Sequence, residues 1–303
     1  MSMSETADIL ALATTKYNMK NNIRDLIEGI QKMRYLLNKG EPITYEQYYN
    51  LLEWKYVSFQ FGNFPKLNVF RATIIGQNED EDKLDQFRFS YPDPKKGVKV
   101  NIGRANIKDY PMFYGSTDFM GSILEIIKTE SDSKIKSIPS TIFVSEWTIK
   151  KPTKFIVHDI RNILSKVPYD KVSPEETVYL NFYLKYFSDI FSSPNAYDFS
   201  SRYAHNLLVG IDDKKGGYSN ILEEPIEMLI YPSIITKSQT VNYAITPTAI
   251  NEKFSLKSIS KMQLPENLNK DNLGNGIHMK KLKIGRLNSK KEDALIEWFD
   301  LDS

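Results

Sequence analysis

The stretch that decides the fold is Gly103–Glu125, GRANIKDYPMFYGSTDFMGSILE. Its apolar run Pro111–Tyr114 is typical of a short β-strand. The polar run Ser116–Asp118 follows and supplies candidate N-caps, because its side-chain oxygens can accept from unpaired backbone amides. The helix expected next carries an apolar face made of Met120, Ile123, Leu124 and Ile127. The stretch therefore predicts a loop, a strand, a turn and a helix in that order.

Three side chains of this stretch are suited to act on a ligand. Arg104 offers a forked donor for phosphate, and Tyr114 offers an aromatic ring. Glu125 lies beside the apolar stripe of the expected helix, where a carboxylate needs a partner because burying an isolated charge is costly. An ordinary surface arginine, core tyrosine and solvated glutamate would give the same pattern, so these residues alone leave both interpretations open.

Composition limits the classes of protein to which the chain can belong. It has 303 residues, 41% hydrophobic and 12% aromatic, which suffices for a sizeable core. With 40 basic and 38 acidic side chains the net charge is +2, which gives no reason to expect nucleic acid or a membrane as partner. The absence of cysteine and the three scattered histidines argue against disulfides and a metal site. No secretory leader or membrane span is recognisable, so we expect a cytoplasmic protein.

The sequence on either side indicates an α-helical N-terminal module, residues 1–60, followed by an α+β domain, residues 61–303. Helical spacing of apolar residues and the capping-box signature Thr44 to Gln47 define the module. Its apolar faces are expected to dock on the rest of the chain. Short strands are predicted over 69–75, 141–149, 228–235 and 241–245, and helices from Ser173 and over 202–209.

Two further segments carry specific predictions. Pro232 cannot donate to a sheet ladder, so the strand it interrupts must bulge or end there, and a bulge commonly aims a side chain into a site. The lysine-rich segment 277–287 has the charge of a nucleic-acid patch. It is more typical of a solvated edge strand protected by lysines.

In their order along the chain, these motifs resemble the RES domain family, named for its Arg, Glu and Ser. The resemblance covers about residues 68–250. The matching segments are Phe70-Arg71, Gly103-Arg104-Ala105-Asn106, Phe113-Tyr114, Leu124-Glu125, Tyr231-Pro232-Ser233 and Asn242–Ile245. Three features depart from the family's pattern: Ala105 replaces a usual Trp, Gly115 replaces a usual Ala, and bulky Ile123-Leu124 stands where small residues are common.

The resemblance implies an ADP-ribosyltransferase-like fold, with a mixed or antiparallel β core and flanking helices, and an enzyme that consumes NAD as a toxin. Glu125 would stabilise the ribosyl cation formed when nicotinamide leaves. Arg71 and Arg104 would hold a pyrophosphate or an incoming phosphate. Tyr114 would pack on the nicotinamide or ribose, and Ser233 would orient a ribose hydroxyl or a phosphate oxygen.

Three functions remain open at this point. The first is NAD cleavage, with inorganic phosphate as the expected co-substrate, in a toxin–antitoxin or defence system. The second is transfer of ADP-ribose to a protein or nucleic acid, and the third is a catalytically silent interaction module. NAD would be a substrate and not a resident cofactor, because the chain has no glycine-rich dinucleotide fingerprint. An antitoxin or other regulatory protein, and a second copy of the chain, are open partners.

Overall fold

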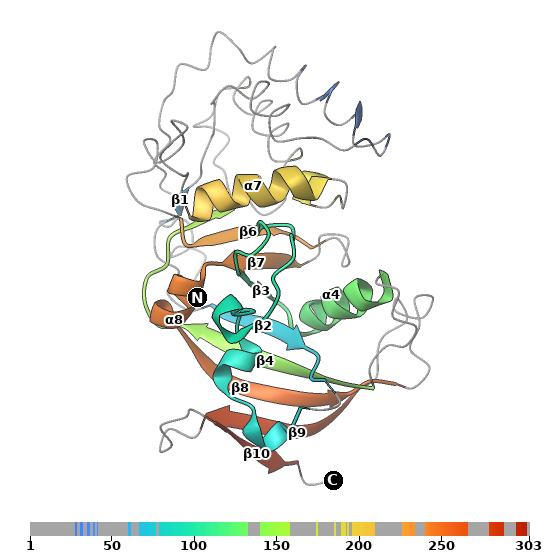
Figure 1. Cartoon of the computed structure of the whole chain (residues 1–303), viewed down its shortest axis with the longest axis vertical. Helices are drawn as coiled ribbons and strands as arrows, with labels where there is room; N and C mark the ends of the chain where they lie inside the picture. The colour runs from blue at the N-terminus through green and yellow to red at the C-terminus, as the bar shows by residue number, and fades with distance from the viewer. Residues whose placement is uncertain are drawn as a thin grey trace.

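The computed structural model describes residues 67–76, 79–132, 140–157, 196–209, 226–233, 240–265, 279–287 and 295–301, with isolated positions between 28 and 61 and between 174 and 193. In these residues the chain combines one large mixed sheet with few helices (Figure 1). This confirms the expected combination of α and β elements.

Among the described residues the sheet has ten strands, in the order β1-β5-β6-β7-β3-β2-β4-β8-β9-β10. Neighbours are antiparallel except β5 and β6, which are parallel. The strands are β1 Gln60–Phe61, β2 Asn68–Thr73, β3 Phe113–Ser116, β4 Thr141–Ile149, β5 Phe155–Val157, β6 Met228–Pro232, β7 Val241–Ile245, β8 Phe254–Gln263, β9 Lys280–Leu287 and β10 Ile296–Asp300. In the continuously described ranges the helices are α4 Phe119–Asp132, α7 Tyr197–Leu208 and α8 Pro247–Lys253, with short 3-10 turns at Glu81–Lys83, Gln86–Phe89 and Pro94–Lys96.

The strands β2 and β3 are neighbours in the sheet but separate along most of their length. These strands share a single register pair, Phe70 with Ser116, whereas β2 pairs with β4 over its whole length and β3 pairs likewise with β7. Beyond that pair the Arg71 side chain reaches into the gap, and its Nη1 donates to the Tyr114 carbonyl over 2.9 Å. A side chain thus satisfies a backbone acceptor that a strand would otherwise satisfy.

Helix α4 forms where the sequence predicts it and lies against β2, β3 and β4 (Figure 1). The Asp118 carboxylate caps its first turn by accepting from the Gly121 amide over 2.6 Å. Ile123 and Ile127 are fully buried in the smaller of two apolar cores, under the helix. Burying each such side chain contributes about 1.5–3 kcal/mol, which is enough to fix the helix on the sheet.

Helix α7 lies beside β6 and supplies aromatic side chains to the larger core (Figure 1). Within α7 the Phe199 and Tyr203 rings stack with centroids 5.8 Å apart. Tyr203 also meets the Phe191 ring edge-on at 6.4 Å, and Phe191 stacks on Tyr231 of β6 at 5.1 Å. Aromatic pairs of this kind add about 0.5–1.5 kcal/mol beyond the area they bury. This packing fixes the position of the first turn of α7, which carries Tyr197.

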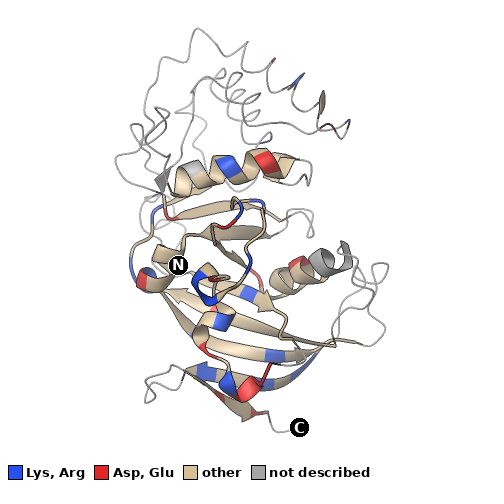
Figure 2. Cartoon of the chain, viewed as in Figure 1, with Lys and Arg blue, Asp and Glu red and all other residues tan. Residues whose placement is uncertain are grey.

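The C-terminal strands belong to the same sheet, because β8 pairs with β4 from one end to the other. The prediction that the lysine-rich segment 277–287 is an edge strand was wrong, since β10 covers the other side of β9. The cause is the segment Ile296–Asp300, in which Ile296 is buried and Trp298 packs against the larger core. Both charge signs occur along this end of the sheet (Figure 2), and Lys283 pairs with Asp300 at 3.6 Å.

Most of the predicted N-terminal module and most of the helix predicted from Ser173 lie outside the described residues, although positions 174, 185 and 189–191 of that helix are described and helical. Tyr35 and Leu36 are helical, and Leu36 packs against the larger core. Residues Gln60–Phe61 form β1, which pairs with β5. None of the helices in the described ranges is long and apolar enough to cross a membrane.

Candidate functional site

A cavity of about 370 Å³ opens where β2 and β3 separate. Its volume falls within the range of small-molecule sites, about 300–1,000 Å³. The wall combines residues of β2, β3, β6 and β7 with α4, the first turn of α7 and the loop before β3. Its main polar side chains are Arg71, Arg104, Tyr114, Glu125, Tyr197 and Asn242.

Glu125 of α4 forms the centre of a polar cluster at this cavity. Its Oε1 accepts from Ser233 Oγ at 2.7 Å and from Asn242 Nδ2 at 2.8 Å. Its Oε2 lies 3.5 Å from Arg104 Nη1, which is an ion-pair distance, and the Glu125 side chain is 21% exposed. Each carboxylate oxygen therefore has a partner on a different element, which fixes the orientation of the group.

The end of β6 and the start of β7 deliver the two donors to Oε1. The strand β6 ends at Pro232, which pairs in register with Val241, and the described residues show no bulge at this point. Ser233 follows directly, and its amide donates to the Thr240 carbonyl at 3.0 Å. Ser233 is fully buried and is not part of the cavity wall.

Arg104 connects Glu125 to helix α7. Its Nε donates to the Tyr197 hydroxyl at 3.2 Å, and its side chain is 15% exposed. Burial lowers the pKa of Arg104, but the nearby oxygens of Tyr231, Glu125 and Tyr197 outweigh burial, so the pKa is raised above its usual value. Arg104 is therefore a permanent cation with two protein partners.

Tyr114 holds the loop that carries Arg104. Its hydroxyl donates to Asn106 Oδ1 at 2.7 Å and accepts from the Ala105 amide at 2.8 Å. Burial raises the pKa of Tyr114, so the hydroxyl keeps its proton. The close approach requires glycine at position 103, where a Cβ would lie 2.5 Å from Asn106 Oδ1 and 2.9 Å from the Tyr114 hydroxyl oxygen.

Arg71 is a partly buried cation with no carboxylate partner among the described residues. Its guanidinium carbon lies 5.4 Å from the centre of the Phe113 ring, and its Nε has no hydrogen-bond acceptor. Burial, followed by the charge of Arg88, lowers the pKa of Arg71 to about 10, so it is still protonated at neutral pH. A partly buried charge without a counter-charge is unfavourable, and an anion in the cavity would compensate it.

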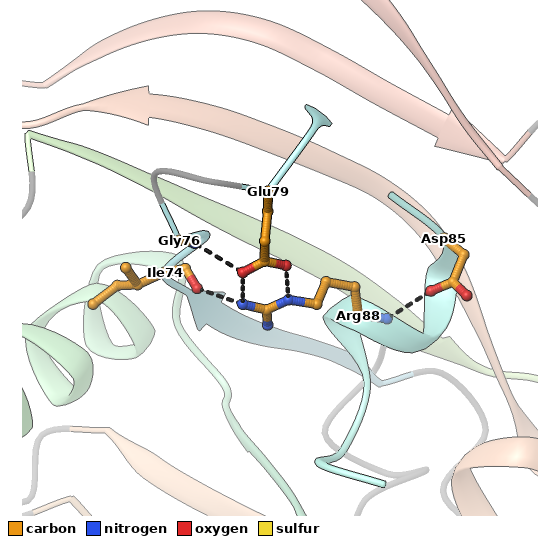
Figure 3. Close-up of polar contacts among 5 residues, drawn as sticks. All are labelled: Ile74, Gly76, Glu79, Asp85 and Arg88. Atoms are coloured by element: carbon orange, nitrogen blue, oxygen red, sulfur yellow. Dashed lines mark hydrogen bonds and ion pairs between the residues drawn. The ribbon is translucent and has the colours of Figure 1, made fainter. Parts of the chain in front are cut away.

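The neighbouring Arg88 is compensated, as Figure 3 shows. Its Nε and Nη2 donate to the two carboxylate oxygens of Glu79 at 2.6 and 2.8 Å, and Nη2 also donates to the Ile74 carbonyl at 2.9 Å. The Arg88 amide donates to the Asp85 carboxylate at 3.0 Å. Arg88 is thus occupied in joining the turn after β2 to the short helix Gln86–Phe89.

The structure gathers all five residues that the sequence singled out. Arg71, Arg104, Tyr114 and Glu125 line the cavity, and Ser233 lies behind it against Glu125. The structure adds Asn242 and Tyr197, to which the sequence analysis gave no role. Asn242 stood in one of the matching motifs, which is the only signal that could have identified it.

The described residues contain no group of three acidic or histidine side chains placed to hold a metal ion. No protein-family model and no curated protein matches this sequence.

Proposed function

We propose that this protein cleaves the nicotinamide–ribose bond of NAD, with inorganic phosphate as the acceptor. The observation that carries the proposal is the position of Glu125, a carboxylate at the cavity wall that Ser233, Asn242 and Arg104 hold in one orientation. The resemblance of the motifs to the RES domain family suggests the substrate.

The chemistry needs a fixed negative charge. When the bond between C1′ of the ribose and the nicotinamide nitrogen breaks, the electron pair leaves with nicotinamide and the ribose becomes cationic. A preorganised carboxylate stabilises that charge without having to reorient during the reaction. A phosphate oxygen then forms the new bond to C1′, which gives ADP-ribose-1-phosphate.

Arg71 and Arg104 take different roles in this proposal. Arg71 has no carboxylate partner in the described part of the chain, so it binds a phosphate group of NAD or the incoming phosphate. Arg104 already has Glu125 and Tyr197 as partners, so it orients the carboxylate. The Tyr114 ring and the apolar wall at Phe70, which borders the same cavity, provide surfaces for a flat ring.

Ser233 acts through Glu125, because it is buried behind the carboxylate. A protein with this activity would deplete NAD in the cytoplasm, so we propose a toxin restrained by an antitoxin or another regulatory protein.

The proposal is tested by incubating the purified protein with NAD at several phosphate concentrations and identifying the products. We expect nicotinamide and ADP-ribose-1-phosphate, formed faster as phosphate rises. Free ADP-ribose formed at a phosphate-independent rate would show that the acceptor is water and not phosphate. Label from NAD on a macromolecule would indicate a transferase, and NAD that stays intact under all these conditions would exclude the enzymatic proposal.

A further inference from the structure

The guanidinium group of Arg104 has one unoccupied donor. Its Nε donates to the Tyr197 hydroxyl at 3.2 Å, and its Nη1 lies 3.5 Å from Glu125 Oε2. Its Nη2 has no hydrogen-bond partner in the described part of the chain, and it is not one of the buried polar atoms that lack a partner. Nη2 is therefore accessible, and it belongs to a residue of the cavity wall.

Nε and Nη2 form one edge of a guanidinium group and donate in parallel, which suits two adjacent oxygen atoms. Arg88 uses this edge fully, since its Nε and Nη2 both bind the Glu79 carboxylate. On Arg104 the Tyr197 hydroxyl takes the Nε position, and the Nη2 position beside it is open. An oxygen atom bound at Nη2 would therefore lie next to the Tyr197 hydroxyl.

The Tyr197 hydroxyl has a proton to donate to such an oxygen. Its oxygen is already the acceptor for Arg104 Nε, so the O–H bond points away from that nitrogen. No group in the described residues accepts the Tyr197 proton. Tyr197 is half-buried and lines the same cavity as Arg104. The two side chains thus offer two donors side by side, one of them charged.

Two adjacent donors of this kind suit an oxyanion. The cavity wall contains two arginines, Arg71 and Arg104, and one carboxylate, Glu125, so its net charge is positive. Phosphate oxygens accept strong, charge-assisted hydrogen bonds from guanidinium groups. A neutral ligand group at Nη2 would leave the excess positive charge of the wall uncompensated.

The place of this position beside Glu125 indicates which anion it takes. In the proposed reaction Glu125 stabilises the cation at C1′ of the ribose, and the acceptor must form its bond at that carbon. Arg104 contacts Glu125, whereas Arg71 has no carboxylate partner among the described residues. An anion at Arg104 therefore lies near the reacting carbon, and Arg71 remains for the diphosphate of NAD.

We propose that Arg104 Nη2 and the Tyr197 hydroxyl form the subsite for the acceptor phosphate, which makes Tyr197 a residue that selects phosphate over water. The inference rests on the proposed function for the identity of this anion as the acceptor. It gives helix α7 a part in ligand binding, and it separates the acceptor from the diphosphate of NAD within one cavity.

Tyr197→Phe tests the subsite, because it removes the hydroxyl and keeps the ring. We expect the KM for phosphate to rise at least about tenfold, since a donor to an anion is lost. The KM for NAD should change by less than about twofold. Equal rises in both KM values, or a lower kcat with an unchanged KM for phosphate, would show that the hydroxyl only supports Arg104 and would overturn the inference.

The matched control is Tyr110→Phe. The Tyr110 ring packs against His205 of the same helix at 4.7 Å, and Tyr110 is not part of the cavity wall. Both KM values should stay at the wild-type level in this variant. Thermal unfolding of each preparation checks that both variants are folded.

Calorimetric titration with inorganic phosphate, without NAD, separates this inference from the proposed function. If phosphate does not promote NAD cleavage but binds, and Tyr197→Phe weakens binding at least about tenfold while Tyr110→Phe does not, the subsite holds and the enzymatic proposal fails. If cleavage depends on phosphate and its KM is unchanged in Tyr197→Phe, the reverse is true. A protein that neither cleaves NAD nor binds phosphate would overturn both.

Discussion

Arg71 and Arg88 lie close enough for the charge of Arg88 to lower the pKa of Arg71, yet only Arg88 has a carboxylate partner among the described residues. Two neighbouring guanidinium groups of the same charge thus differ in whether a carboxylate compensates that charge. The Glu79 carboxylate compensates Arg88, and the Arg71 charge remains available to the cavity. This asymmetry assigns a structural role to one arginine and a ligand-binding role to the other.

Replacement of Arg71 by glutamine should weaken anion binding and leave the fold intact. Loss of a charge-assisted contact costs about 1.5–3 kcal/mol, so the KM for phosphate or for NAD should rise about tenfold to a hundredfold. Steady-state kinetics with each substrate varied in turn measures the effect. Arg88→Gln is the control, and it should lower stability without changing either KM. Unchanged KM values in Arg71→Gln would show that Arg71 does not bind the substrate or the phosphate.

Glu79 should make the stability of the protein sensitive to acid. Its hydrogen bonds to Arg88 lower its pKa from 4.5 to about 2 in the folded protein. A lowered folded-state pKa means that the stabilisation is complete above about pH 4.5 and disappears as the pH falls toward 2. The free energy of unfolding of wild type should therefore exceed that of Glu79→Gln above pH 4.5, and the two should converge near pH 2. Parallel denaturant titrations measure both.

The control for this acid effect is Glu252→Gln, which changes an exposed carboxylate on α8. It should follow the wild-type stability profile across the same pH range. A gap between wild type and Glu79→Gln that stays constant with pH would show that the carboxylate charge is not the cause.

Glu125→Gln should lower NAD turnover about a hundredfold to a thousandfold and leave the fold intact. Glutamine keeps an oxygen for Ser233 and Asn242 but removes the negative charge from the face toward Arg104 and the ribosyl cation. Turnover and thermal unfolding are measured on the same preparation. The matched control is Glu146→Gln. It removes a carboxylate of β4 that accepts hydrogen bonds from Lys257 and Ser258 of β8. Near-normal turnover in a folded Glu125→Gln protein would refute the catalytic role.

Tyr114→Phe should destabilise the loop that carries Arg104. The change leaves the Ala105 amide without its acceptor and Asn106 Oδ1 without its donor, which costs about 1–3 kcal/mol in the free energy of unfolding. Turnover should fall because Arg104 loses its support, although the aromatic ring is kept. Tyr91→Phe, which removes a hydroxyl that accepts from Asn251 near the surface, should change stability by less than about 0.5 kcal/mol. Equal stabilities of the two variants would contradict the proposed support.

Local sequence patterns were sufficient for several elements in and around the site. The strands over 141–149 and 241–245 have the predicted bounds, and Asp118 caps α4 as expected. These features depend on alternation and capping, which act between residues close in sequence.

Features that depend on distant partners could not be read from the sequence. Alternation in β8 is interrupted because Leu256 pairs with Trp147 and Ser258 with Glu146, which leaves Lys257 without an opposite residue. The role of Tyr197 depends on a hydrogen bond to Arg104, 93 residues earlier in the chain. No local pattern records such a contact, and the helix was expected to begin only near residue 202.

Because β2 and β3 share a single register pair, the binding cavity lies at the boundary where the two halves of the sheet are joined least extensively. One half of the sheet contributes Ser233 and Asn242, the other half contributes Arg71, and α4 contacts strands of both halves. A ligand that contacts both Arg71 and Glu125 would connect the two halves of the sheet where they share few hydrogen bonds. It would hold the halves in register and raise the unfolding temperature as its concentration rises above the Kd. Substrate and scaffold would then stabilise each other.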